Sequence, residues 1–216
     1  MLNVPAGKVT VHLPGVDARF RPLTEAEMAE WRSRLSLPAA YFLSVGTLEP
    51  RKNIIGLLDA YALLRERTPT APPLLLAGSR GWLYEETLAH ISRLSLGDSV
   101  QLREDVPAAG FPALYHGALA LIMPSFYEGF GLPPLEAMAC GTLPIVSNRS
   151  SLPEVVGEVG ALIEPEDPQS IAAAMARALE DTAWRDSQGA AGIARAAGFR
   201  WEDAARIALA TYTHVV

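Results

Sequence analysis

Short runs of apolar residues alternate along most of the chain with segments whose apolar residues recur every three or four positions. Six runs predict buried strands, at residues 41–45, 74–77, 100–102, 119–123, 143–146 and 161–163. A helix capped by Asn53 is predicted from the residues that follow it at helical spacing, Ile54, Leu57, Leu58 and Tyr61. Because this alternation is typical of a parallel sheet, the pattern predicts an α/β fold with helices on both faces of the sheet.

Helical periodicity marks the remaining segments. A third helix is predicted from Pro133 onward, after a second one that contains Leu88, Ile91 and Leu94. Beyond residue 163 the strands stop, and Asp167 is placed to cap a helix that two further helical segments follow, the last at 201–215. Ligands of parallel sheets bind outside the carboxyl ends of the strands, so we expect the functional residues in the loops there.

The segment 124–141 carries two carboxylates in an unusual setting. It reads Pro-Ser-Phe-Tyr-Glu-Gly-Phe-Gly-Leu-Pro-Pro-Leu-Glu-Ala-Met-Ala-Cys-Gly, with Glu128 and Glu136 eight positions apart. A double proline begins a helix but does not sit in its middle, which places Glu128 in a loop and Glu136 in the first helical turn. The N–H groups between them lie at the positive end of a helix dipole and form an anion site. A nucleotide sugar, which carries both hydroxyls and phosphates, suits this arrangement.

Composition narrows the classes of partner. The chain of 216 residues is long enough for one sizeable core, yet no apolar run approaches the roughly 18 to 20 residues that span a bilayer. It opens with no leader and has a single cysteine, Cys140, so we expect a cytoplasmic protein. A net charge of −6 without a basic stripe argues against nucleic acid as a partner. The four histidines lack metal-ligand spacing and there is no Asp-x-Asp pair, so we expect no essential metal and no cofactor.

The spacing of Glu128 and Glu136 resembles the Glu-x7-Glu motif of retaining glycosyltransferases of the GT-B fold, in particular family 4. Three other segments resemble that family in the same order: Val-Gly-Thr-Leu-Glu-Pro-Arg-Lys-Asn at 45–53, Ala-Gly-Ser-Arg-Gly-Trp at 77–82 and Ser-Asn-Arg-Ser-Ser-Leu-Pro-Glu-Val at 147–155. The resemblance covers roughly residues 8–216. It implies the nucleotide-sugar-binding, C-terminal half of a GT-B enzyme, a Rossmann-like three-layer domain that acts without a metal in cell-surface polysaccharide biosynthesis.

The resemblance assigns the basic pair after the first strand to the diphosphate of the donor. The lysine at the position of Lys52 contacts this diphosphate in the family, and Arg51 stands beside it. Both side chains suit the negative charge that builds on the leaving diphosphate, so both are candidate catalytic residues with Glu128. Thr47 stands where many relatives have an arginine, which leaves open whether Arg51 takes over that charge or is a surface residue. For Lys52, the alternative is a solvated basic loop.

The same resemblance divides the rest of the donor between the two glutamates. Glu136 is expected to accept hydrogen bonds from both ribose hydroxyls, and Glu128 is expected beside the donor sugar. The alternatives are a Glu136 favoured only by the helix dipole and a Glu128 that accepts from local N–H groups. The other positions expected to contact the donor are Gly46, Thr47, Gly78 and Val106, together with the N–H groups of Gly129, Phe130, Gly131 and Leu132.

Three smaller expectations concern packing. Ser151-Leu152-Pro153-Glu154 has the spacing of a capping box. We expect packing roles for Trp82, Trp184 and Trp201, and burial for Cys140.

The first forty residues indicate a partner domain that is missing from the chain. Residues 1–36 are interpreted as a remnant strand and linker of an acceptor-binding N-terminal domain, 37–199 as the nucleotide-sugar-binding domain and 200–216 as a C-terminal crossover helix. We therefore expect half an enzyme, inactive alone and associated with membranes only through the missing half. Residues 1 to about 20 are expected to be disordered or to add as a strand to a neighbouring copy, which would give a dimer caused by truncation.

The leading hypothesis is the donor half of a retaining hexosyltransferase that transfers a sugar to a glycan or lipid-linked acceptor. A stand-alone module that binds a nucleotide sugar without catalysis is a second hypothesis. A fragment of a sugar epimerase with GT-B architecture is a third. The fold alone does not separate these functions.

Overall fold

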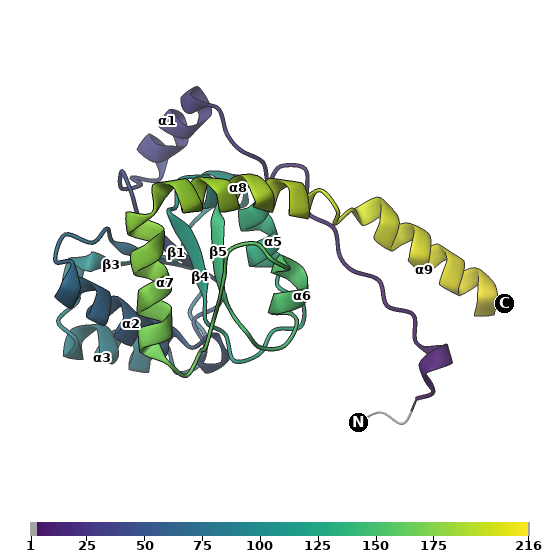
Figure 1. The fold of residues 1–216 in the computed structure, drawn as a ribbon, viewed down its shortest axis with the longest axis horizontal. Coiled ribbons are helices and arrows are strands. Elements are labelled where there is room, and N and C mark those ends of the chain that lie inside the picture. The colour runs from purple at the N-terminus through teal and green to yellow at the C-terminus, as the bar shows by residue number, and fades with distance from the viewer. Residues whose placement is uncertain (1–3, 216) are drawn as a thin grey trace.

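A fully parallel sheet of six strands forms the centre of the computed structural model, which describes residues 4–215 (Figure 1). The strands are β1 (Phe42–Val45), β2 (Leu74–Ala77), β3 (Val100–Arg103), β4 (Ala120–Met123), β5 (Leu143–Ser147) and β6 (Ala161–Ile163). Their order is β3-β2-β1-β4-β5-β6, so the chain winds outward first on one side of β1 and then on the other. All six predicted strands are confirmed to within one residue at each end.

Helices cover both faces because successive strand residues point to opposite sides of the sheet. Phe42 and Leu76 are buried on the face covered by α2 (Ile54–Arg67), α3 (Tyr84–Arg93) and α7 (Pro168–Glu180). Leu43 and Leu75 are buried on the opposite face. The helices on that side are α1 (Glu25–Arg34), α4 (Phe111–His116), α5 (Leu132–Ala139), α6 (Leu152–Val156) and α8 (Thr182–Ala196). The predicted Rossmann-like α/β class is therefore confirmed.

Helix ends follow the predicted caps at two places. The Asn53 side chain accepts a hydrogen bond of 3.2 Å from the N–H of Gly56 in the first turn of α2. Asp167 accepts one of 2.9 Å from the N–H of Gln169 in the first turn of α7. Each cap satisfies an N–H group that the helix itself leaves without a partner.

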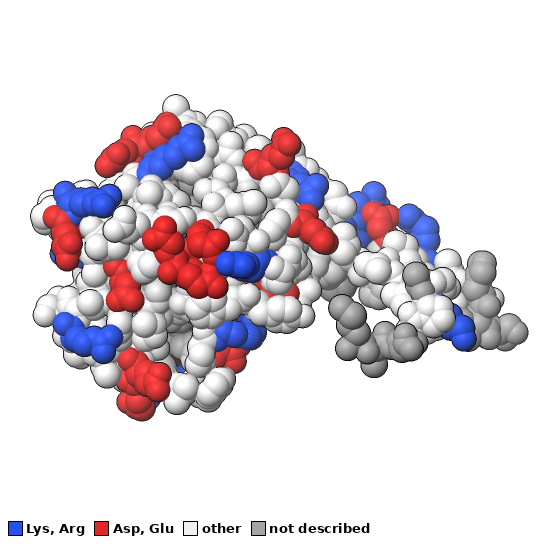
Figure 2. All heavy atoms as spheres, turned by 60° about the horizontal axis from the view of Figure 1, so that its bottom comes forward, with Lys and Arg blue, Asp and Glu red and all other residues white. Residues whose placement is uncertain are grey.

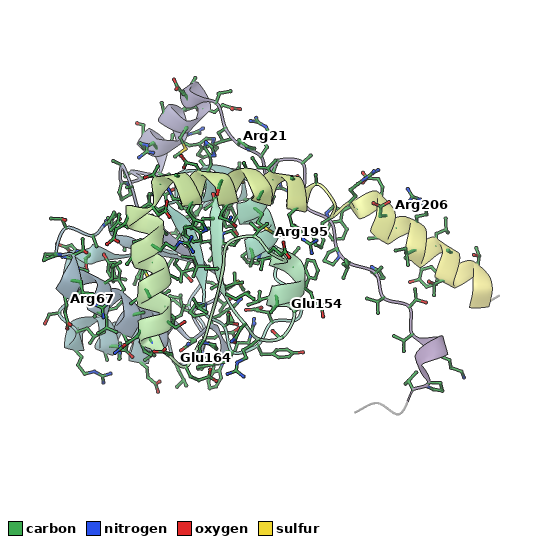
Figure 3. The ribbon with its side chains drawn as sticks, in the orientation of Figure 1. Arg21, Arg67, Glu154, Glu164, Arg195 and Arg206 are labelled. Atoms are coloured by element: carbon green, nitrogen blue, oxygen red, sulfur yellow. The ribbon has the colours of Figure 1, made fainter. Side chains whose placement is uncertain are left out.

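Arg195 joins α8 to the end of α6 (Figure 3). Its Nε donates to the carbonyl oxygen of Val155 at 3.1 Å, and its Nη2 donates to that of Glu154 at 2.7 Å. These carbonyls belong to the last turn of α6, where helical partners run out. The bonds hold α6 and the loop before it against the body of the domain.

Two segments extend away from this body: residues 4–14 and the last helix, α9 (Trp201–Val215) (Figure 1). They leave it together, since a Cβ on Gly15 would lie 2.2 Å from the backbone nitrogen of Trp201. Just after this point, the Val16 N–H donates to the carbonyl oxygen of Phe199 at 3.0 Å, and Phe20 packs against the core. Residues 15–20 are thus held by the domain, contrary to the predicted disorder.

The expectation of a disordered or exchanged strand also covers the residues before position 15. Residues 9–14 pair with no strand of the sheet. Residues 1–3 lie outside the described part of the chain. Dimerisation through an exchanged strand stays a prediction.

Acidic and basic side chains are interspersed on the face shown in Figure 2, without a broad basic area. Between residues 4 and 215, no helix is both long and apolar enough to cross a membrane. The cytoplasmic location and the absence of nucleic acid as a partner stay predictions.

Candidate functional site

The predicted site residues lie at the carboxyl edge of the sheet, where its winding direction changes. Arg51 and Lys52 follow β1 in a short 3₁₀ helix, Pro50–Lys52, and Glu128 follows β4. Because β1 and β4 are neighbours in the sheet, loops that are 76 positions apart in sequence meet in space. Ligands of open α/β sheets bind at this switch point, so the topology and the motif indicate the same place.

Glu128 is held between the two predicted cations. Its Oε1 accepts from Lys52 Nζ at 2.7 Å, and its Oε2 accepts from Arg51 Nη1 at 2.9 Å. The side chains of Lys52 and Glu128 are only 10% and 9% exposed, whereas that of Arg51 is 45% exposed. The structure thus brings all three candidate catalytic residues together, with Lys52 and Glu128 as a buried ion pair and Arg51 facing solvent.

Glycine at position 46 makes room for the lysine. A Cβ on Gly46 would lie 3.1 Å from Lys52 Cε and 3.2 Å from its Nζ, and the φ of +139° is one that side chains rarely adopt. Gly78 packs still more closely, since its Cβ would come within 2.1 Å of the Gly46 carbonyl oxygen. These two glycines therefore let β1 and β2 end against each other beneath the Lys52 side chain.

Glu49 is a member of the cluster that the sequence did not reveal. Its Oε1 lies 2.6 Å from Arg51 Nε, so Arg51 bridges two carboxylates. Two cations therefore face two carboxylates, and their charges cancel. In the sequence, only the closeness of Glu49 and Arg51 in one loop pointed to this ion pair, and closeness in sequence does not determine which side chains pair.

The loop after Glu128 presents backbone donors beside this cluster. Among the described residues, the N–H groups of Gly129, Phe130, Gly131 and Leu132 donate to no partner. The Phe130 side chain anchors the loop by packing edge-on against Phe199, with ring centroids 6.0 Å apart. The loop is thus fixed while its donors stay free, which is a suitable arrangement for an anion.

Two serines of the segment before α6 hold the same loop. Ser150 Oγ accepts from the Glu128 N–H at 2.9 Å, and Ser151 Oγ lies 3.0 Å and 2.6 Å from the carbonyl oxygens of Glu128 and Phe130. The capping box predicted at Ser151 is wrong, because its side chain makes no cap bond to α6. Its hydroxyl instead bonds carbonyl groups more than twenty positions earlier in the sequence.

Glu136 lies in the second turn of α5, not in the first turn as predicted. Gly131, with a φ of +116°, lets the helix begin at Leu132, one residue before the predicted Pro133. Glu136 accepts a hydrogen bond of 2.7 Å from the hydroxyl of Tyr115, another residue that the sequence did not reveal. Burial raises the pKa of Glu136 above its ordinary 4.5, although the bond from Tyr115 and the charge of Arg19 work against the rise.

Glu136 faces a hollow apart from the Glu128 cluster. The hollow has a volume of about 400 Å³, and Asp17, Arg19, Phe111 and Trp201 also line it. Arg19 is paired with Asp17 at 2.8 Å, so it is not committed to Glu136. The linker before α1 therefore contributes side chains to the surroundings of Glu136, a contribution that the sequence did not indicate.

The other predicted contacts are more scattered. The Thr47 hydroxyl lies 3.4 Å from that of Ser79, in the loops that follow β1 and β2. Val106 is half-buried against the core on the α4 side. Packing is confirmed for Cys140, which is buried, and for Trp184, which packs against the core beneath the Arg177 guanidinium. It is wrong for Trp82 and Trp201, which are 66% and 51% exposed.

Within the described residues, no three His, Cys, Asp or Glu side chains are grouped so as to hold a metal ion. The predicted independence from metal stays a prediction.

Comparison with known proteins gives consistent matches. The family model "Glycosyl transferases group 1" matches residues 27–195. The chain is 39% identical over 204 residues to O-antigen chain mannosyltransferase B of Escherichia coli, covering 94% of this chain and 54% of that protein. Sucrose-phosphate synthase from Thermosynechococcus elongatus superposes with a TM-score of 0.82 at 31% identity, covering 94% and 51%. Anabaena Alr3699/HepE, solved with UDP and glucose, shares the fold with a TM-score of 0.79 at 23% identity, covering 93% and 55%. The chain spans about half the length of these proteins.

Proposed function

The chain belongs to the glycosyl transferases group 1 family, and we propose that it is the donor-binding half of a retaining hexosyltransferase of family 4. It binds a nucleoside-diphosphate sugar. Together with an acceptor-binding domain outside this chain, it transfers the sugar to a glycan or lipid-linked acceptor without an essential metal. The names of its mannosyltransferase relatives favour mannose as the sugar and a cell-surface polysaccharide as the product.

The observation that carries the proposal is the meeting of Lys52, Arg51 and Glu128 beside the free N–H groups of loop 129–132. Two cations and a row of backbone donors suit the four or so charged oxygens of a diphosphate better than any neutral ligand. A carboxylate at the same point suits a sugar hydroxyl, or the positive charge that develops at the anomeric carbon. Few ligands other than a nucleotide sugar need both sets of groups together.

Binding of the donor then exchanges ion pairs. Lys52 and Arg51 release Glu128 and donate to phosphate oxygens, while Glu128 turns to the sugar. As the bond from the anomeric carbon to the diphosphate breaks, the negative charge of the leaving group grows between the two cations, which lowers the barrier. Glu136 accepts from the ribose hydroxyls in its ionised form, and the Tyr115 hydroxyl fixes its orientation.

Calorimetry with UDP, GDP and the corresponding nucleosides tests these roles. Lys52→Ala should weaken diphosphate binding roughly tenfold to over a hundredfold, the effect of about 1.5 to 3 kcal/mol for a lost hydrogen bond to a charged group. It should leave nucleoside binding nearly unchanged. Lys8, the other lysine of the chain, is exposed and gives the matched control Lys8→Ala. Glu136→Ala should weaken both classes of ligand, because they share the ribose.

An equal effect of Lys52→Ala on nucleosides and diphosphates would remove the assignment of this lysine to phosphate. We also expect no sugar transfer by this chain alone, because one wall of the donor cleft lies outside it. Transfer to an acceptor by the isolated chain would show that the second domain is not needed.

A further inference from the structure

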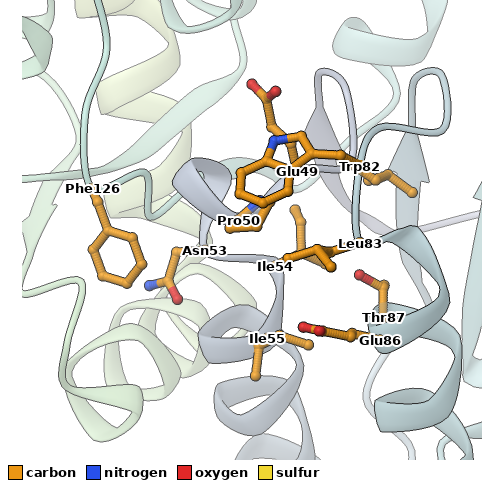
Figure 4. A pocket seen from close by; sticks show the side chains of 11 residues that line it. Glu49, Pro50, Asn53, Ile54, Ile55, Trp82, Leu83, Glu86, Thr87 and Phe126 are labelled. Carbon is orange, nitrogen blue, oxygen red and sulfur yellow. The ribbon is translucent and has the colours of Figure 1, made fainter.

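A second pocket lies on the α2 and α3 side of the Glu128 cluster, and the proposed function leaves it unused (Figure 4). It has a volume of about 310 Å³, at the small end of ligand-binding pockets. We call it the Trp82 pocket; among the residues that line it are Glu49, Ile54, Trp82, Glu86, Thr87 and Phe126.

Aromatic and polar groups of the pocket are free to meet a ligand. Trp82 is 66% exposed and Phe126 is 44% exposed, and Figure 4 shows them on opposite sides of Asn53 and Pro50. Within the described chain, the Trp82 indole N–H, the Glu86 carboxylate and the Thr87 hydroxyl have no hydrogen-bond partner. An exposed ring beside donors and acceptors that no protein group uses offers a ligand both an apolar face to pack on and polar groups to bond.

The charges of the pocket exclude the donor's phosphates as its ligand. Among the described residues, no lysine or arginine lines it, whereas two glutamates do. Glu49 is already paired with Arg51, which leaves Glu86 as the uncompensated acceptor. A neutral polyol fits best, because its C–H face can pack on the indole while its hydroxyls bond Glu86 and Thr87.

The pocket is connected to the reaction centre through shared residues. Glu49 lines the pocket and pairs with Arg51, which in turn pairs with Glu128. Phe126 lies two positions before Glu128, and its N–H donates to the Arg51 carbonyl oxygen at 2.9 Å. A ligand in the Trp82 pocket therefore lies on the same loops that hold the donor.

We propose that the Trp82 pocket binds a neutral hexose residue of the acceptor glycan, next to the site of transfer. The acceptor's role rests on the proposed function, whereas the binding of a neutral sugar does not. A hexose in the pocket contacts loop 124–128 through Phe126, two positions before Glu128.

The test is a titration of the 216-residue chain with mannotriose, a neutral trisaccharide, followed by the indole N–H signals in NMR spectra. The Trp82 signal should shift with a dissociation constant of about 1 mM, as expected for a small open pocket. Trp82→Ala and Phe126→Ala should each weaken binding about tenfold, measured by ligand-observed saturation transfer. Tyr212→Ala, which removes another exposed aromatic ring from α9, should leave it unchanged.

The Trp82 and Phe126 side chains are both exposed, so truncating them leaves the core intact. Glu86→Gln, a variant with a side chain of unchanged size, should also weaken mannotriose binding. Lys52→Ala should weaken UDP binding roughly tenfold to over a hundredfold and leave mannotriose binding intact, which separates the two sites. UDP binding without mannotriose binding overturns the pocket proposal and leaves the donor site standing. Unchanged mannotriose binding by Trp82→Ala, or a preference for trilysine over mannotriose, overturns it as well.

Discussion

Replacing Glu128 by glutamine should destabilise the protein when no nucleotide is added. The side chain of its partner Lys52 is only 10% exposed, and the two are 2.7 Å apart. Removing one member of a buried ion pair costs about 3 to 5 kcal/mol, because the remaining charge stays buried without compensation. The glutamine oxygen still accepts a hydrogen bond from Lys52, so we expect a loss of about 2 to 3 kcal/mol. For a chain of this size, that lowers Tm by roughly 4 to 12 °C.

The same substitution should strengthen nucleoside-diphosphate binding. In the native protein Glu128 competes with the ligand for the two cations and repels its phosphates. Two like charges about 5 Å apart repel by roughly 3 kcal/mol at an effective dielectric constant of 20. If removing the charge of Glu128 relieves about half of this repulsion, the dissociation constant of the diphosphate falls about tenfold. Lys52→Ala, in contrast, should weaken the same binding.

Thermal unfolding with and without UDP, together with calorimetry, measures both effects. Glu158→Gln is the matched control, because Glu158 is an exposed glutamate in no ion pair within the described chain. Saturating UDP should raise Tm more for Glu128→Gln than for the native chain. Weaker UDP binding by Glu128→Gln would refute the competition between carboxylate and phosphate, and an unchanged Tm would refute the buried ion pair.

Two further predictions concern the glycines and the second glutamate. Gly78→Ala should lower the unfolding free energy by roughly 2 to 5 kcal/mol, because its Cβ would collide with the Gly46 carbonyl at a positive φ. Gly129→Ala, whose Cβ meets no atom within 4 Å, should change the unfolding free energy by less than about 0.5 kcal/mol. Unfolding both variants in urea measures the two free energies. Since burial raises the pKa of Glu136, its ionisation opposes folding at neutral pH, and this opposition should vanish as pH falls through the raised pKa towards 4.5. Uridine binding, which needs the ionised form, should weaken over the same range, and Glu136→Gln should remove this step; a pH profile that the variant leaves unchanged would refute the role of Glu136.

Much of the fold could be predicted because its signals are local. The buried strand β2 reads as a continuous apolar run, and the run at 74–77 matches it at both ends. The run at 161–163 also matches its strand at both ends, although β6 lies at the sheet edge with Leu162 exposed. The place of Lys52 and Glu128 at the carboxyl edge of the sheet also followed from a general rule, since both residues lie in loops that follow parallel strands. The neighbouring position of β1 and β4, which makes the meeting of Lys52 and Glu128 possible, is a property of the sheet order that periodicity does not encode.

The failed predictions share a physical cause. Ser151 has the spacing of a cap, but long-range carbonyls of loop 128–130 take its hydroxyl. Tyr115 and Glu136 are paired across two helices that are distant in sequence, so no local pattern revealed the bond that orients Glu136. Trp82 was expected to pack, and only the tertiary structure shows its ring exposed.

The central claim, that Lys52 binds the diphosphate in place of Glu128, has a direct measurement because the chain contains only two lysines, Lys8 and Lys52. NMR of a chain labelled with ¹³C at the lysine ε-carbon gives one signal for each. Titration with UDP should shift the Lys52 signal to saturation and leave that of Lys8 in place, whereas uridine should shift neither. Saturable UDP binding that leaves the Lys52 signal unmoved would contradict the account.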